Sequence, residues 1–80
     1  MNNEWIRVSY LKPEMHDLKN GIYRSDDVLI ALPGDEMTIA SLIYDADMRD
    51  MYWLSHIGEY RYNIGLVTHW QKLPKHPNHE

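Results

Sequence analysis

The sequence predicts a small, mostly β fold: an antiparallel meander of about four strands, with a long early loop. That loop allows one short helical turn, so a small α+β fold is the alternative. Three observations favour this fold class. Apolar and polar residues alternate with a period of two, β-branched and aromatic residues fill these stretches, and clusters of Pro, Gly, Asn and Asp separate them. The 80 residues suit one domain, spanning residues 1–80.

Residues 4–11 are expected to form the first strand. Ile6, Val8 and Tyr10 fall on one side of this strand and would face the core. Pro13 has no amide hydrogen to donate to a strand ladder, so we expect the strand to stop near it.

Residues 12–24 show no clear period and are expected to form the long loop. A proline followed by an acidic residue can begin a helix, which allows one helical turn over residues 14–19. Asn20-Gly21 then indicates a turn.

A β-hairpin is predicted over residues 26–44. The apolar run 26–32 and the alternating run 37–44 are joined by Pro33-Gly34-Asp35-Glu36, which has the composition of a turn. The polar, acidic segment 45–50 then leads to a short apolar run, residues 51–54, whose periodicity fits a strand or a helical turn equally well.

The last long strand is predicted over residues 60–70, where, after Gly58, mostly apolar side chains at even positions alternate with mostly polar ones at odd positions. Gly65 lies within it and indicates a bulge. The end of the chain carries two prolines and no apolar period, so residues 75–80 are expected to form a flexible tail.

Composition favours a cytoplasmic protein. The chain has no cysteine, no basic and apolar leader at its start, and no apolar run of the roughly 20 residues that cross a bilayer. We therefore expect no membrane association. The net charge is −4 and the eight Lys and Arg residues are scattered along the chain, which makes nucleic acid an unlikely direct partner.

No motif for catalysis, metal binding or cofactor binding is present, so we expect a protein that is not an enzyme and needs no cofactor. The serines lack the sequence context of a nucleophile, and the glycines are too isolated for a phosphate loop. Among the five histidines only His76 and His79 are close together, and they fall in the predicted tail. His69 is interpreted as a half-buried strand residue that bonds to a backbone carbonyl.

Aromatic and acidic residues offer the best candidates for function. Trp5 and Trp70 are expected to form the core that joins the first and last strands, and Trp53 and Tyr62 to complete it. Tyrosine, tryptophan and arginine are enriched at interface hot spots, and clustered carboxylates can steer a basic partner. The predicted partner-binding residues, an acidic group followed by an aromatic one, are Asp45, Asp47, Arg49, Asp50, Tyr52, Tyr60 and Arg61.

Two end segments carry a resemblance to a known family. Trp5-Ile6-Arg7-Val8 resembles the W-I-x-V opening of the phage and prophage domain of unknown function 551, and residues 67–74 resemble its closing V-T-H-W-x-P-L-P signature. Segments 28–31 and 39–45 are similar to its central strands. The resemblance implies a small accessory protein of an enteric phage or prophage, acting in the bacterial host cell, and it implies no activity.

These observations together predict a non-enzymatic phage or prophage accessory protein that binds and inhibits a host protein, such as a CRISPR-type defence component. Host takeover and defence evasion are what the resemblance implies for such small proteins. Two alternatives remain open. One is a small-ligand module that sequesters a nucleotide between aromatic side chains, and the other is a structural accessory protein that works as an oligomer.

Overall fold

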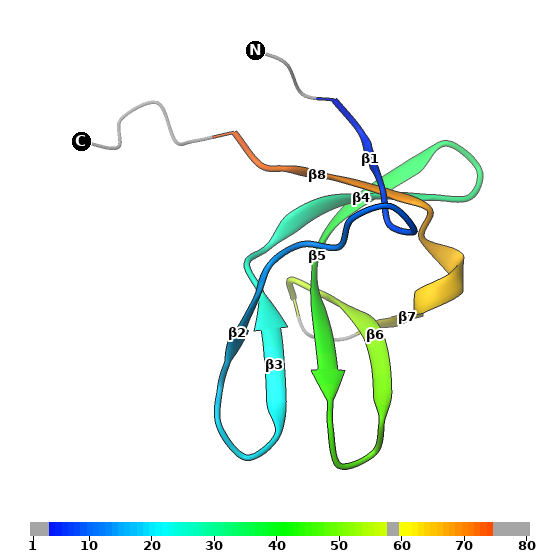
Figure 1. Ribbon diagram of the computed structural model, residues 1–80. Coiled ribbons are helices and arrows are strands. Elements are labelled where there is room, and N and C mark those ends of the chain that lie inside the picture. The colour runs from blue at the N-terminus through cyan, green and yellow to red at the C-terminus, as the bar shows by residue number, and fades with distance from the viewer. Residues whose placement is uncertain (1–3, 58–59, 75–80) are drawn as a thin grey trace.

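One antiparallel sheet of eight strands curls around an apolar core in the computed structural model, which describes residues 4–57 and 60–74 (Figure 1). The strands are β1 (Ile6–Arg7), β2 (Met15–Asp17), β3 (Ile22–Ser25), β4 (Val28–Leu32), β5 (Glu36–Asp45), β6 (Asp50–Ser55), β7 (Arg61–Asn63) and β8 (His69–Lys72). A single 3-10 turn, η1 (Ile64–Leu66), precedes β8. The mostly β, antiparallel prediction is confirmed, but the predicted number of about four strands is wrong. Within the described residues, no helix is long and apolar enough to cross a membrane.

The ten-residue strand β5 organises the sheet, because it pairs with three other strands. Its first half pairs with β4, from Leu32 opposite Glu36 to Val28 opposite Ala40, which confirms the predicted hairpin. Its second half pairs with β3 on the same side and with β6 on the other side. The connection from β4 to β5 is a three-residue turn in which Gly34 has a φ of +78°, a conformation that favours glycine.

A β-bulge separates β3 from β4 where both lie along β5. Arg24 is opposite Ile43 and Val28 is opposite Ala40, so three residues of one strand face two of the other. The extra residue reverses the alternation, and it turns Val28 and Ile30 toward the core. The buried hydroxyl of Ser25 satisfies the backbone here: it accepts from Leu42 N at 2.8 Å and donates to the carbonyl of Asp26 at 2.8 Å.

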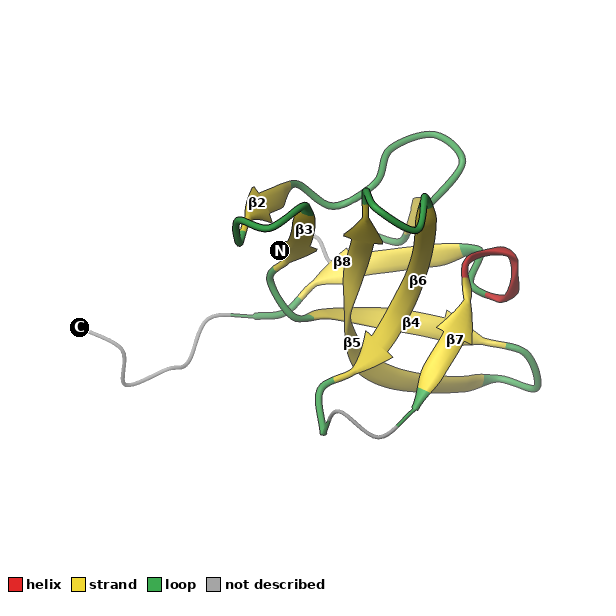
Figure 2. Ribbon diagram, turned by 90° about the horizontal axis from the view of Figure 1, so that it is seen from below, coloured by secondary structure: helices red, strands yellow, loops and turns green. Residues whose placement is uncertain are grey.

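The remaining strands extend the sheet on both sides of β4 and β5. On one side β8 pairs with β4 and β1 pairs with β8, so the first and last strands are neighbours. On the other side β6 pairs with β7. Figure 2 shows β4 and β8 crossing β6 and β7 at a steep angle, with β5 bending from one group to the other. The apolar core lies inside this bend.

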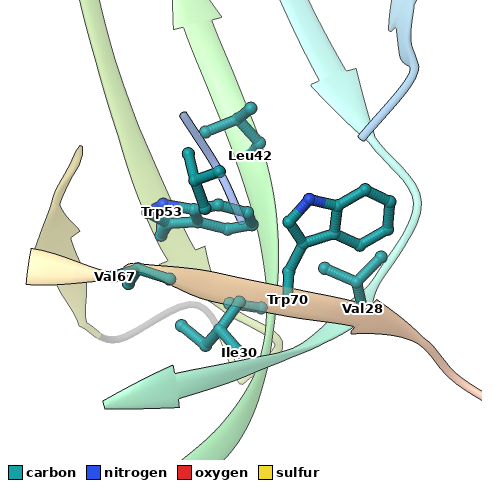
Figure 3. Close-up of a cluster of buried hydrophobic side chains, with 8 residues drawn as sticks. Val28, Ile30, Leu42, Trp53, Val67 and Trp70 are labelled. Atoms are coloured by element: carbon teal, nitrogen blue, oxygen red, sulfur yellow. The ribbon is translucent and has the colours of Figure 1, made fainter. Parts of the chain in front are cut away.

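Two tryptophans occupy the centre of the core. Trp53, which is fully buried on β6, and Trp70, 4% exposed on β8, converge with Ile30 and Leu42 from β4 and β5 (Figure 3). Tyr62 packs against this cluster and is partly buried. The predicted core positions of Trp53, Trp70 and Tyr62 are therefore confirmed.

The first strand is much shorter than predicted. Tyr10 N and Leu11 N both donate to the carbonyl of Arg7 at 3.0 Å, so the chain turns directly after β1 and the alternation stops. Val8 is buried as expected, but Tyr10 is 84% exposed. Trp5 is 39% exposed, so its predicted place in the core is wrong, although β1 and β8 do pair.

Two further predictions of local structure are wrong. Residues 14–19 contain strand β2, which pairs with β3, instead of a helical turn, and the turn between the two strands is made by three residues with positive φ, Lys19, Asn20 and Gly21. Residues 60–70 do not form one long strand, because η1 interrupts them, and Gly65 lies in that turn rather than in a bulge.

The choice between strand and helical turn for residues 51–54 now has an answer. They belong to strand β6, because they pair with β5 on one side and β7 on the other. Of the polar segment 45–50, residues 46–49 form the turn, and its two end residues belong to β5 and β6. Gly58 and the predicted tail, residues 75–80, lie outside the described residues.

Candidate functional site

The predicted acidic residues lie at the turn between β5 and β6. Asp45 closes this turn: its Oδ1 accepts from Asp47 N at 3.1 Å and from Met48 N at 3.2 Å. Asp50 stands directly opposite Asp45 at the start of β6. Asp47 is exposed, and Arg49 is exposed with a φ of +53°. Asp45 therefore has a structural function as well as a charge.

A second turn lies beside the first at the same end of the molecule (Figure 1). The backbone of Ala46 donates to the carbonyl of Gly21 at 2.8 Å, which ties the β5–β6 turn to the β2–β3 turn. Asp17 Oδ1 accepts from Lys19 N in this second turn. We call residues 17–21 and 45–50 together the acidic tip, because they carry four carboxylates, those of Asp17, Asp45, Asp47 and Asp50.

The aromatic part of the prediction lies on the side of the sheet that faces away from the core. The guanidinium carbon of Arg61 is 4.3 Å from the centre of the Tyr52 ring, a cation–π contact between β6 and β7. Asp50 and Tyr52 are two residues apart on β6, so their side chains leave the strand on the same face. The acidic tip is therefore continuous with the Tyr52–Arg61 pair.

Tyr60 does not join this group. It lies beyond the other end of β6, where its N donates to Ser55 Oγ at 3.3 Å and its carbonyl accepts from Ser55 N. Its side chain is 59% exposed. The structure thus brings six of the predicted partner-binding residues along one connected surface and leaves Tyr60 at the far end of the β6–β7 hairpin.

The same face contains residues that the sequence did not indicate. One row of cross-strand partners runs over five strands, and we call it the outer row: His16, Arg24, Ile43, Tyr52 and Asn63. Its centre is well packed, because Ile43 is only 5% exposed and Arg24 Nε donates to the fully buried Ser41 Oγ at 3.0 Å. Such a row depends on strand register, which no spacing in the sequence revealed.

The histidines in the described residues do not assemble into a metal centre. His16 Nε2 lies 3.5 Å from Asp26 Oδ1, and both side chains are largely exposed. His69 is half-buried as expected, but its side-chain partner is the Thr68 hydroxyl at 2.9 Å instead of a backbone carbonyl. In residues 4–57 and 60–74 no group of three metal-ligating side chains is found, and His76 and His79 fall outside this part of the chain.

Comparisons with protein-family models, with curated proteins and with solved structures find no match for this chain. The resemblance to the phage domain of unknown function 551 therefore stays a prediction.

Proposed function

We propose that this chain is a non-enzymatic protein-binding module whose contact surface is the outer row, Arg61 and the acidic tip. The observation that supports this proposal best is the stacking of Arg61 on Tyr52, 4.3 Å from the ring centre, on an outward-facing part of the sheet. Tyr and Arg are the residues that most often dominate binding energy at protein interfaces. Here they are held in a fixed arrangement before any partner arrives, which lowers the entropy cost of binding.

The chemistry of the partner follows from the charges around this pair. The carboxylates of the acidic tip would meet a basic patch and increase the rate of association. The guanidinium group of Arg61 contacts the Tyr52 ring through its flat face. The N–H groups at its edge can therefore donate to a carboxylate or carbonyl of the partner. The partner we propose is a host or defence protein with a basic surface, in keeping with the phage setting that the resemblance implies.

The first experiment asks whether a partner contacts the proposed surface and not another part of the chain. A photo-crosslinking amino acid is placed at Tyr52 and, as a control, at Met37, which is 60% exposed in the β4–β5 hairpin away from the proposed surface. In bacterial lysate, one protein should crosslink to the Tyr52 probe and should be competed away by unlabelled wild-type chain. Equal crosslinking from Met37 would count against the surface.

The captured protein then allows affinity to be measured. Removing Tyr52 and Arg61 together should cost at least about 2 kcal/mol of binding free energy, which is about thirtyfold in Kd. The matched control is Tyr10→Ala, because this side chain is 84% exposed and lies outside the surface. Similar losses for both variants would contradict the proposal.

The acidic tip is tested by association rates. The triple change Asp45→Asn, Asp47→Asn and Asp50→Asn removes charge, and an asparagine at position 45 keeps an oxygen that can accept from Asp47 N and Met48 N. Association should slow at low salt, and the difference should shrink as salt is added. An unchanged rate would mean that the tip does not steer the partner. The nucleotide-sequestering and oligomeric alternatives stay predictions.

A further inference from the structure

A cleft of about 310 Å³ is lined by residues of the turn that follows β1, of η1 and of the start of β8. These three segments lie away from the two turns that form the acidic tip (Figure 1). Strand pairing places Arg7 directly opposite His69 on the rim of the cleft. The hydrogen bonds that turn the chain after β1 bring Lys12 back to the same cleft. Three basic side chains, two from the start of the chain and one from near its end, therefore line one cleft.

The charge of this cleft is opposite to that of the whole chain. The protein has 12 acidic and 8 basic residues, yet the described residues that line the cleft include two cations, Arg7 and Lys12, and no carboxylate. A concentration of positive charge in a net negative molecule favours an anionic ligand, because low-dielectric walls strengthen the local field.

The other lining groups fit the same ligand. Ser9 and Thr68 add hydroxyl groups at the rim, and the buried side chains of Val8 and Val67 supply apolar wall. Thr68 Oγ1 lies 2.9 Å from His69 Nδ1. Where the hydroxyl donates in this contact, the proton of the neutral imidazole is on Nε2, which makes His69 a further donor for an oxyanion.

We propose that this cleft binds the phosphoryl group of a small phosphorylated molecule, with Arg7 and Lys12 pairing with its oxygens and the apolar wall contacting its organic part. Arginine matches phosphate through two parallel hydrogen bonds, and lysine adds a point charge. The site is separate from the protein-binding surface proposed above and does not depend on it.

The test is a titration of the whole isotope-labelled chain followed by NMR, at constant ionic strength, with three probes: inorganic pyrophosphate, adenosine diphosphate and adenosine. Amide signals of Gly65, Thr68 and His69 should move with pyrophosphate and with adenosine diphosphate, and should not move with adenosine. Tighter binding of adenosine diphosphate would support both parts of the proposal, because the organic part would then use the apolar wall. Equal binding would support the phosphoryl site and would overturn the contact proposed for the apolar wall.

Variants separate the cleft from general electrostatics. Arg7→Gln and Lys12→Gln should each weaken pyrophosphate binding about tenfold, because each removes one charge-assisted contact. The control is Lys72→Gln, which removes a cation at the other end of β8, outside this cleft. Both Lys12 and Lys72 are exposed, so a change in fold at these positions is not expected, and dispersion of the amide signals checks it. No movement of the three amide signals, equal binding of adenosine, or an equal loss in Lys72→Gln would overturn the proposal.

Discussion

Replacing Ser25 with alanine should destabilise the protein far more than the same replacement of an exposed serine. Ser25 is 4% exposed, and its Oγ accepts from the backbone N of Leu42, a residue that is fully buried. The bulge removes the strand partner that Leu42 N would otherwise have. Without the hydroxyl this N–H is buried and unsatisfied.

The magnitude follows from that unsatisfied group. A buried donor without a partner costs about 1–3 kcal/mol, so we expect Ser25→Ala to lower the free energy of unfolding by about 2 kcal/mol. For a domain of this size that loss corresponds to a fall in Tm of roughly 10 °C. The matched control is Ser9→Ala, an exposed serine, which should stay within about 0.5 kcal/mol of wild type.

Two measurements check the reasoning. Chemical denaturation gives the free energy of unfolding of both variants, and hydrogen exchange reports on the amide of Leu42 alone. Exchange of that amide should accelerate in Ser25→Ala and stay unchanged in Ser9→Ala. A Ser25→Ala protein that is as stable as Ser9→Ala, with Leu42 still fully protected, would refute the function that we assign to this serine.

The remaining predictions concern a turn and the core. Asp45→Ala should lower the free energy of unfolding by about 1 kcal/mol, because the turn loses the oxygen that accepts from two amides. The control Asp47→Ala, at an exposed position, should have little effect. Thermal denaturation compares the two variants, and equal losses would contradict the function assigned to Asp45. Trp70→Phe should cost about 1 kcal/mol more than Trp53→Phe, since Trp70 Nε1 donates to the carbonyl of Leu11 at 2.8 Å while the buried Nε1 of Trp53 has no partner among the described residues. Denaturant unfolding measures both variants, and a larger loss for Trp53→Phe would contradict this explanation.

Alternation and turn composition predicted the fold where the strands are long. The pair β4 and β5 has five residues or more in each strand, so β4 was visible as an apolar run and β5 as an alternating run, and Pro33-Gly34 marked the turn between them. Strands of three or four residues, such as β2 and β3, are too short to show a period. Their existence depends on partners across the sheet, which is why the number of strands was underestimated.

Backbone turns explain the other differences. The turn after β1 rests on two amides that donate to the carbonyl of Arg7, a contact without a signature in side-chain pattern. It places Tyr10 in solvent although its spacing from Ile6 and Val8 fits a core position. The bulge between β3 and β4 likewise changes which residues face inward, and nothing in the sequence analysis indicated it.

The part of the candidate site that lies on one turn and one strand was predictable from the sequence. Asp45, Asp50 and Tyr52 are close in sequence, so one turn and one strand keep them together. The basic cleft could not be read from spacing, because Arg7 and His69 come from opposite ends of the chain. One signal did exist: once the first and last strands are expected to pair, Arg7 and His69 are expected to approach each other.

Pairing of the first and last strands also determines how the molecule would respond to mechanical load. The strands β1 and β8 are antiparallel. The chain enters β1 at Ile6 and leaves β8 at Lys72, so both chain ends leave from the same end of the β1–β8 ladder. Tension applied through residues 4 and 74 would therefore peel this ladder open one residue pair at a time, and would not shear all its hydrogen bonds at once. β1 has one neighbour and two paired residues, whereas β8 is also held by β4, so β1 would detach first. Pulling on the chain would separate Arg7 from His69 while the long strand β5 and the surface around Tyr52 stay in place.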